Sequence, residues 1–204
     1  MNSNGVGILG AGTIGRLMAR YLLGAGYEVA LSNSRGPSTL GGVVRELGPG
    51  ASAATAQEAA AAEVVLLAVP WRSATGLLES LPPWGGRILV DATNAVISYT
   101  PEKTEVHDFG SRTSSEVVAA AAATARVVKA FNTLPYPLFV QPPRVAGGRR
   151  VMLLSGDQAD AKQTVSSIIE RIGYAPVDLG PLAEGSRVQQ AAGPLAALDL
   201  RLGD

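Results

Sequence analysis

Short apolar runs alternate along this chain with longer segments whose apolar side chains recur every three or four positions. The runs lie at residues 6–9, 28–32, 63–69, 87–91, 126–131, 150–155 and 174–179, and a weaker one lies at 51–54. Runs of this length predict buried strands, and the longer periodic segments predict helices. Helices are expected from Thr13 onward and at 40–47, 55–62, 73–81, 114–123 and 158–172. This alternation is typical of an α/β protein with a mostly parallel sheet.

Three segments fit the alternation less well. Residues 96–112 lack clear periodicity and are expected to form an irregular surface excursion, and residues 137–148 are expected to form a proline-rich loop. Residues 183–202 are expected to form one or two helical segments, interrupted at Gly193 and Pro194. We therefore expect one main domain at residues 1–182 and a small C-terminal helical extension at residues 183–204.

The turn between the first strand and the first helix reads G-x-G-x-x-G over residues 10–15. In this motif Gly10 permits a tight turn, Gly12 lets a pyrophosphate approach the backbone, and Gly15 lets the helix pack closely on the strand. The free N–H groups at the start of the helix favour an anion. A glycine-rich turn of another α/β protein is the alternative. The strand before it and the helix after it favour dinucleotide binding.

A doubly wound Rossmann fold follows from this turn together with the strand–helix alternation. The first six strands are expected in the order 3-2-1-4-5-6, and the strands near residues 150 and 175 extend the sheet to about eight. In such a fold, ligands lie outside the carboxyl ends of the strands, so the residues that directly follow the strands are the candidates for binding.

The end of the second strand indicates which dinucleotide binds. An NAD site usually places an acid there, but this chain reads Asn33, Ser34 and Arg35. A carboxylate would repel a 2′-phosphate, whereas Ser34 and Asn33 can donate hydrogen bonds to it and Arg35 can add a charged, planar fork of donors. NADP(H) is therefore favoured over NAD(H). A solvated loop arginine is the alternative for Arg35.

Composition narrows the class of protein further. The 204 residues carry a formal net charge of zero, so charge gives no support for a nucleic-acid or anionic-membrane partner. The chain has no cysteine and a single histidine, His107, which argues against disulfides, thiolate catalysis and a histidine-based metal site. No signal peptide is recognised and no apolar run approaches the ~20 residues of a membrane span, so a cytoplasmic protein is expected.

Further candidates follow the central strands. Val69, Pro70 and Trp71 follow one strand, and Trp71 could wall the ribose–nicotinamide region or simply pack at the strand end. Asn94 and Asn132 follow two other strands. Their amides could bind the nicotinamide carboxamide or a substrate carbonyl, and capping or turn roles are the alternative.

The chain lacks a recognisable acid–base pair. Lys129 lies inside a strand and need not face the site, His107 is expected at the surface, and no Tyr-x-x-x-Lys is present. This favours hydride transfer between NADPH and a small-molecule ring acceptor such as a flavin or deazaflavin, which needs proximity and orientation rather than a protein acid. Two alternatives remain: reduction of a small carbonyl or imine, with Tyr136 or water as proton source, and a non-catalytic NADP(H)-binding redox sensor.

The chain resembles a known family in five segments, which read GVGILGAGTIG, NSRGP, LLAVPW, DATN and RVVKAFNTL. They are similar to the NADPH-dependent F-420 reductases (deazaflavin coenzyme:NADP oxidoreductases) and to the cytosolic oxidoreductase domain of six-transmembrane metalloreductases. The resemblance implies a Rossmann domain that is often dimeric. It also implies pyrophosphate contacts from Thr13 and Ile14, 2′-phosphate contacts from Ser34 and Arg35, and a cofactor flanked by the Val69–Trp71 segment with Ala130 and Asn132 near the nicotinamide.

Overall fold

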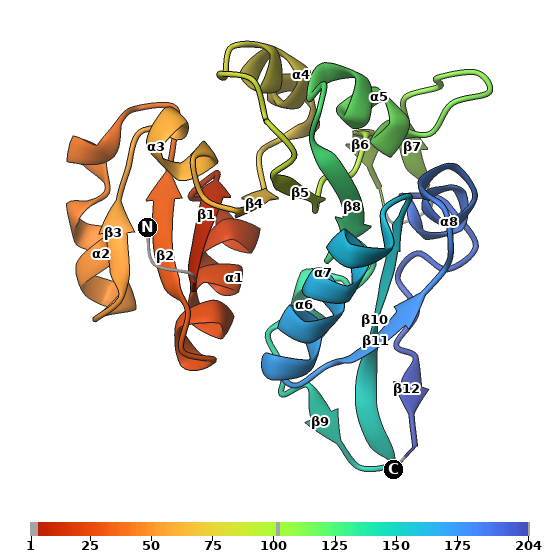
Figure 1. Cartoon of the computed structure of the whole chain (residues 1–204). Coiled ribbons are helices and arrows are strands. Elements are labelled where there is room, and N and C mark those ends of the chain that lie inside the picture. The colour runs from red at the N-terminus through yellow and green to blue at the C-terminus, as the bar shows by residue number, and fades with distance from the viewer. Residues whose placement is uncertain (1–3, 101–102, 204) are drawn as a thin grey trace.

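One twisted sheet runs through the protein, and the computed structural model describes residues 4–100 and 103–203 (Figure 1). Its strand order is β11-β10-β8-β5-β4-β1-β2-β3. The central strands are β1 (Gly5–Leu9), β2 (Glu28–Ser32), β3 (Ala51–Ala53), β4 (Val64–Leu67), β5 (Ile88–Asp91) and β8 (Arg126–Ala130), and all six run parallel. The predicted order of the first six strands is therefore confirmed.

The last two strands reverse the direction of the sheet. The long strand β10 (Gly148–Gly156) pairs antiparallel with β8, and β11 (Ala175–Asp178) lies parallel to β10. These are the two strands expected near residues 150 and 175. The fold is thus the predicted doubly wound Rossmann fold, with a mostly parallel sheet of about eight strands.

Helices cover both faces of the sheet. Successive side chains of each buried strand point to opposite faces, so each face has its own apolar core under its helices. In β4, Val64 and Leu66 join one apolar cluster and Val65 and Leu67 join the other. The first core includes residues of α1 (Thr13–Gly24), α6 (Tyr136–Phe139) and α7 (Ala159–Arg171). The second includes residues of α3 (Ala56–Ala60), α4 (Trp71–Glu79), α5 (Ser114–Ala121) and α8 (Leu182–Gln189). The remaining helices are η1 (Pro37–Thr39) and α2 (Gly41–Leu47).

The predicted start of the helix at residues 55–62 is confirmed in atomic detail. Thr55 caps α3 by accepting a hydrogen bond from the backbone N–H of Glu58, and the Glu58 carboxylate accepts one from the backbone N–H of Thr55. These bonds lower the pKa of Glu58, because they favour its charged form. A second capping box, from Thr113 and Glu116, starts α5.

The expectation of an irregular segment at residues 96–112 is wrong in part. The strands β6 (Val96–Tyr99) and β7 (Thr104–Val106) pair antiparallel as a separate two-stranded sheet with a shift in register. Their side chains are mostly exposed, so no apolar face produced the alternation by which a strand is recognised. Backbone pairing makes this hairpin, and backbone pairing leaves little trace in sequence.

Two further segments differ from expectation. The expected proline-rich loop at residues 137–148 overlaps most of α6 and contains a short strand, β9 (Arg144–Val145), that pairs with β10. The predicted C-terminal helices reduce to α8, because the chain beyond it forms turns and then the short strand β12 (Arg201–Leu202), which also pairs with β10. Leu182, at the proposed domain boundary, is buried in the second core. The division at residue 182 stays a prediction.

Candidate functional site

The glycine turn connects β1 to α1 at the carboxyl edge of the parallel sheet. Leu9, the last residue of β1, pairs with Ser32 in β2 and Leu67 in β4, so three strand ends lie level there. Gly10 has a φ of 116°, a conformation that favours glycine, and a Cβ on it would lie 2.3 Å from the Ala68 carbonyl oxygen.

The other two glycines of the turn differ from each other. A Cβ on Gly15 would lie 1.8 Å from the Gly10 carbonyl oxygen, so close packing of the helix on the turn excludes any side chain. A Cβ on Gly12 would meet no described atom within 4 Å. Gly12 borders the cleft described next. Packing therefore demands glycine at positions 10 and 15, whereas position 12 is open on the side where a ligand could lie.

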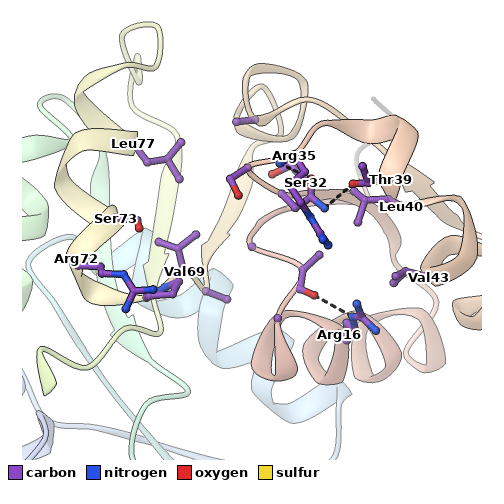
Figure 2. A pocket seen from close by; sticks show the side chains of 18 residues that line it. Arg16, Ser32, Arg35, Thr39, Leu40, Val43, Val69, Arg72, Ser73 and Leu77 are labelled. Atoms are coloured by element: carbon purple, nitrogen blue, oxygen red, sulfur yellow. Dashed lines mark hydrogen bonds between the residues drawn. The ribbon is translucent and has the colours of Figure 1, made fainter. Parts of the chain in front are cut away.

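A cleft of about 600 Å³ opens at this edge of the sheet (Figure 2). Arg16, Arg35, Thr39, Leu40 and Val43 lie on one side, and Val69, Arg72, Ser73 and Leu77 lie on the other (Figure 2). The first side belongs to α1 and the segment after β2, and the second belongs to the end of β4 and α4. The cleft thus spans the point at which the strand order reverses, where α/β proteins bind their ligands.

The charges in the cleft are of one sign. Arg16, Arg35 and Arg72 line it, and no aspartate or glutamate does among its described lining residues. Arg16 donates from Nε to the Ala11 carbonyl oxygen at 2.9 Å, which holds its guanidinium beside the glycine turn. Within the described chain the guanidinium groups of Arg35 and Arg72 have no hydrogen-bond or ion-pair partner. The cleft therefore suits an anion with several charged groups.

The backbone that carries Arg35 is fixed by its neighbours. Asn33 Oδ1 accepts a hydrogen bond from the backbone N–H of Arg35 at 3.0 Å, and Asn33 Nδ2 donates to Thr39 Oγ1 at 2.9 Å. The Asn33 side chain thus makes a turn that leaves the exposed Ser34 and Arg35 side chains free. Asn33 has a structural role here that the sequence did not indicate.

About half of the predicted binding residues line this cleft: Gly10, Gly12, Asn33, Ser34, Arg35, Val69 and Pro70. Thr13 borders an adjacent hollow with Arg16 and Tyr136. Ile14 packs partly buried against the core, Gly15 is buried, and Ala130 is buried in the core. None of these four lines the cleft, and all fourteen assignments as cofactor-binding residues stay predictions.

Asn94 and Asn132 lie side by side at the ends of β5 and β8, as expected. Asn94 Nδ2 donates to the Asn132 carbonyl oxygen at 2.8 Å, and Asn132 Nδ2 donates to Asn94 Oδ1 at 3.1 Å and to the Gln189 carbonyl oxygen at 2.7 Å. These bonds connect two strand ends to α8. Asn132 is 8% exposed, so its amide is occupied within the protein.

Lys129 is buried in an ion pair beneath this edge. Its Nζ lies 3.0 Å from Asp91 Oδ2, and both side chains are 0% exposed. Asp91 also accepts hydrogen bonds from Thr93 Oγ1 at 2.6 Å and Ser115 Oγ at 2.7 Å, and Lys129 Nζ donates to the Thr93 carbonyl oxygen. Lys129 is therefore a structural cation and does not face the cleft, which the sequence left open.

Sequence reasoning missed several lining residues: Arg16, Ser32, Thr39, Leu40, Val43, Arg72, Ser73 and Leu77. Arg72 follows Trp71 directly, so its place after a strand end was a usable signal. The residues of α1 and α2 lie one or more helical turns from any strand end and offered no such signal. No group of three or more histidines, aspartates or glutamates that could hold a metal lies in residues 4–100 and 103–203, and no helix there is long and apolar enough to cross a membrane.

Known proteins are similar to this chain over most of its length. Residues 5–95 match the family described as NADP oxidoreductase coenzyme F420-dependent. The solved structure of hypothetical protein SMa0349 from Sinorhizobium meliloti shares 40% identity, covers 96% of this chain and 94% of its own, and superposes with a TM-score of 0.87. A candidate F420-dependent NADP-reductase from Arthrobacter sp. FB24 shares 28% identity, with 87% and 84% covered and a TM-score of 0.71.

A curated relative extends the comparison to a larger protein. Metalloreductase STEAP3 of Rattus norvegicus is 34% identical over 186 residues, which cover 90% of this chain but 35% of that protein. The chain spans about a third of the length of the curated relatives it matches. The glycine turn and all the described residues that line the cationic cleft lie within residues 5–95, the segment that matches the NADP oxidoreductase family described as coenzyme F420-dependent.

Proposed function

We propose that this protein binds NADP(H) in the cleft and transfers hydride between NADPH and a deazaflavin (coenzyme F-420) or flavin acceptor. The observation that carries the proposal is the charge of the cleft: its described lining residues include three arginines and no carboxylate, and Gly12, which has an open backbone, also borders it. An adenosine carrying a 2′-phosphate and a pyrophosphate has the charge that such a cleft would neutralise.

The residues present fit this cofactor. Gly12 leaves space where a side chain would meet a pyrophosphate, and the free N–H groups at the start of the twelve-residue helix α1 point a positive dipole end toward the same place. Ser34 and Arg35 are exposed and available to a 2′-phosphate. Val69 and Pro70 border the cleft on the side of β4 and would flank the cofactor's middle.

When bound, the cofactor supplies a hydride, which is two electrons and one proton, and the acceptor ring takes one further proton from water. The described residues that line the cleft include no histidine, lysine, tyrosine, aspartate or glutamate. Lys129 is buried and paired, so it is not available as an acid. The protein would therefore act by holding two rings against each other, which suits a ring acceptor better than a carbonyl.

Reduction of a small carbonyl or imine is the second candidate, and the position of Tyr136 favours it. Tyr136 is 46% exposed and borders the hollow beside the glycine turn with Thr13 and Arg16, so its hydroxyl is accessible as a proton donor near the cofactor helix. Tyr136→Phe would remove that donor and keep the ring. Under the first candidate this variant keeps its activity.

An acceptor panel followed at the NADPH absorbance tests the proposal. Purified protein receives NADPH with coenzyme F-420, FMN, riboflavin, a small ketone or a cyclic imine. Oxidation with F-420 or a flavin, but not with ketone or imine, supports the first candidate, and the opposite pattern supports the second. Tight NADPH binding without turnover on any acceptor would identify a non-catalytic redox sensor and overturn the enzymatic proposal.

A further inference from the structure

Three aromatic rings from distant parts of the chain gather beside the cleft. The ring centroids of Trp71 and Phe109 lie 5.3 Å apart, those of His107 and Phe109 lie 6.0 Å apart at an interplanar angle of 24°, and those of Trp71 and His107 lie 6.5 Å apart. Trp71 begins α4, and the other two follow β7. Trp71 and Phe109 are half-buried and His107 is exposed, so the cluster keeps an open edge.

The cluster adjoins the residues expected at the nicotinamide end. Trp71 directly follows Pro70, which lines the cleft. The backbone N–H of His107 donates to the Ala95 carbonyl oxygen at 2.9 Å, and Ala95 directly follows Asn94 at the end of β5. The hairpin of β6 and β7 thus fixes two rings at the edge of the sheet, next to the strand ends that neighbour the cleft.

A small cavity lies against the same rings. It has a volume of about 20 Å³ and is lined by Ala95, Val106, His107, Phe109, Ser114, Gln190 and Ala191. That volume holds one water molecule or one polar atom of a larger ligand. Ser114 is 1% exposed, and its Oγ has no hydrogen-bond partner among the described residues. Within the described chain this hydroxyl therefore has hydrogen-bonding capacity left for a water molecule or a ligand atom in the cavity.

We propose that Trp71, His107, Phe109 and Ser114 form the binding site for the acceptor ring, a flat heteroaromatic compound of the deazaflavin or flavin class. The inference rests on the proposed function and names its second ligand site. The aromatic cluster gives the ring a face to stack on, and Ser114 Oγ donates to an oxygen at the edge of the ring. Because the cluster borders Pro70 and Asn94, a ring held there would meet a nicotinamide that enters from the cleft.

A binding experiment tests the site without relying on turnover. The chain has two tryptophans, Trp71 and Trp84, so the variant Trp84→Phe leaves Trp71 as the single reporter. With saturating NADP⁺, titration of FMN or F-420 should quench Trp71 fluorescence in a saturable way. His107→Ala in the same background should weaken the apparent affinity about tenfold, because a stacked ring is lost. Quenching that does not saturate, or an unchanged affinity in His107→Ala, would overturn the site.

Kinetics supply the second measurement, in the protein with both tryptophans. His107→Ala and Phe109→Ala should each raise the acceptor KM about tenfold and leave the dissociation constant for NADPH unchanged. Ser114→Ala should raise it about fivefold, for one lost hydrogen bond. Tyr99→Ala is the matched control, because Tyr99 is 78% exposed on the same hairpin and outside the cluster. Its KM should equal that of the unmodified protein.

The outcomes separate this inference from the proposed function. If the unmodified protein oxidises NADPH with F-420 or flavin, but the cluster variants keep their acceptor KM, the site is wrong and the function stands. An equal rise in KM for Tyr99→Ala would assign the effect to the hairpin's packing and also reject the site. If no acceptor supports turnover while Trp71 quenching saturates and depends on His107, the ring site stands and the catalytic proposal fails.

Discussion

At Gly12 the packing of the described chain leaves room for a side chain, whereas the proposed ligand requires glycine. Its added Cβ would meet no described atom within 4 Å, whereas that of Gly15 would lie 1.8 Å from a backbone oxygen. Gly12→Ala should therefore change the free energy of unfolding by less than about 1 kcal/mol and weaken NADPH binding at least tenfold. Gly15→Ala is the matched control and should destabilise the fold by about 1–3 kcal/mol. Denaturant unfolding and NADPH titration measure both effects. An unchanged NADPH affinity in Gly12→Ala would remove the turn from the site.

Arg35 should distinguish the two nicotinamide dinucleotides. If its guanidinium bonds the 2′-phosphate, Arg35→Ala costs NADPH about 1.5–3 kcal/mol of binding free energy and leaves NADH nearly unaffected. Arg45→Ala is the control, because Arg45 is exposed in the last turn of α2 and does not line the cleft. Calorimetric titration with both cofactors gives the comparison. Equal losses for NADPH and NADH would reject the 2′-phosphate assignment.

Among the elements, the Arg150–Asp199 contact ties the C-terminal segment to β10. Arg150 Nε lies 2.9 Å from Asp199 Oδ1, and this hydrogen bond is the main reason why the pKa of Asp199 lies below its ordinary value of 3.8. A lowered pKa means that the folded state favours the carboxylate. Its contribution to stability is complete above the ordinary pKa and is lost as the pH falls through the lowered one.

Asp199→Asn should therefore be less stable than the unmodified protein at neutral pH, and the difference should shrink below about pH 4. Urea unfolding over a pH series measures it. A difference that stays constant with pH would show that the ionised pair does not contribute. Asp160→Asn offers a comparison, because its carboxylate is exposed and lies in a pair at the surface, where salt and water weaken the interaction.

Which elements the sequence predicts depends on what holds each one in place. The buried strands and α7 were found because their apolar side chains face a core. The β6–β7 hairpin and β12 were missed, because backbone hydrogen bonds and exposed side chains make them. The same holds for the cleft: seven residues that follow strand ends were found, whereas Leu40, Val43 and Leu77 were not, because their place depends on how helices pack. Ser32 and Arg72 also lie at strand ends and were missed.

For the molecule as a whole, the buried Asp91–Lys129 pair joins β5 to β8, and Ser115 connects it to α5. Lys129→Met would leave the Asp91 charge unpaired and without solvent, which should cost about 3–5 kcal/mol of stability. Combining it with Asp91→Asn removes that charge and should recover part of the loss. Guanidinium unfolding of both variants provides the measurement. A cost below about 1 kcal/mol for Lys129→Met would mean that the pair is not required.

The two walls of the cleft come from different parts of the chain, one from α1 and the segment after β2, the other from the end of β4 and α4. A ligand that touches both walls can bind only when they stand together, so it must make unfolding more costly. At a concentration of one hundred times its dissociation constant, the gain is about 2.7 kcal/mol. The melting temperature thus reports ligand binding without an acceptor, and NADP⁺ should raise it more than NAD⁺ at equal concentration. The shift in melting temperature can also rank a panel of unlabelled nucleotides by their affinity for the cleft.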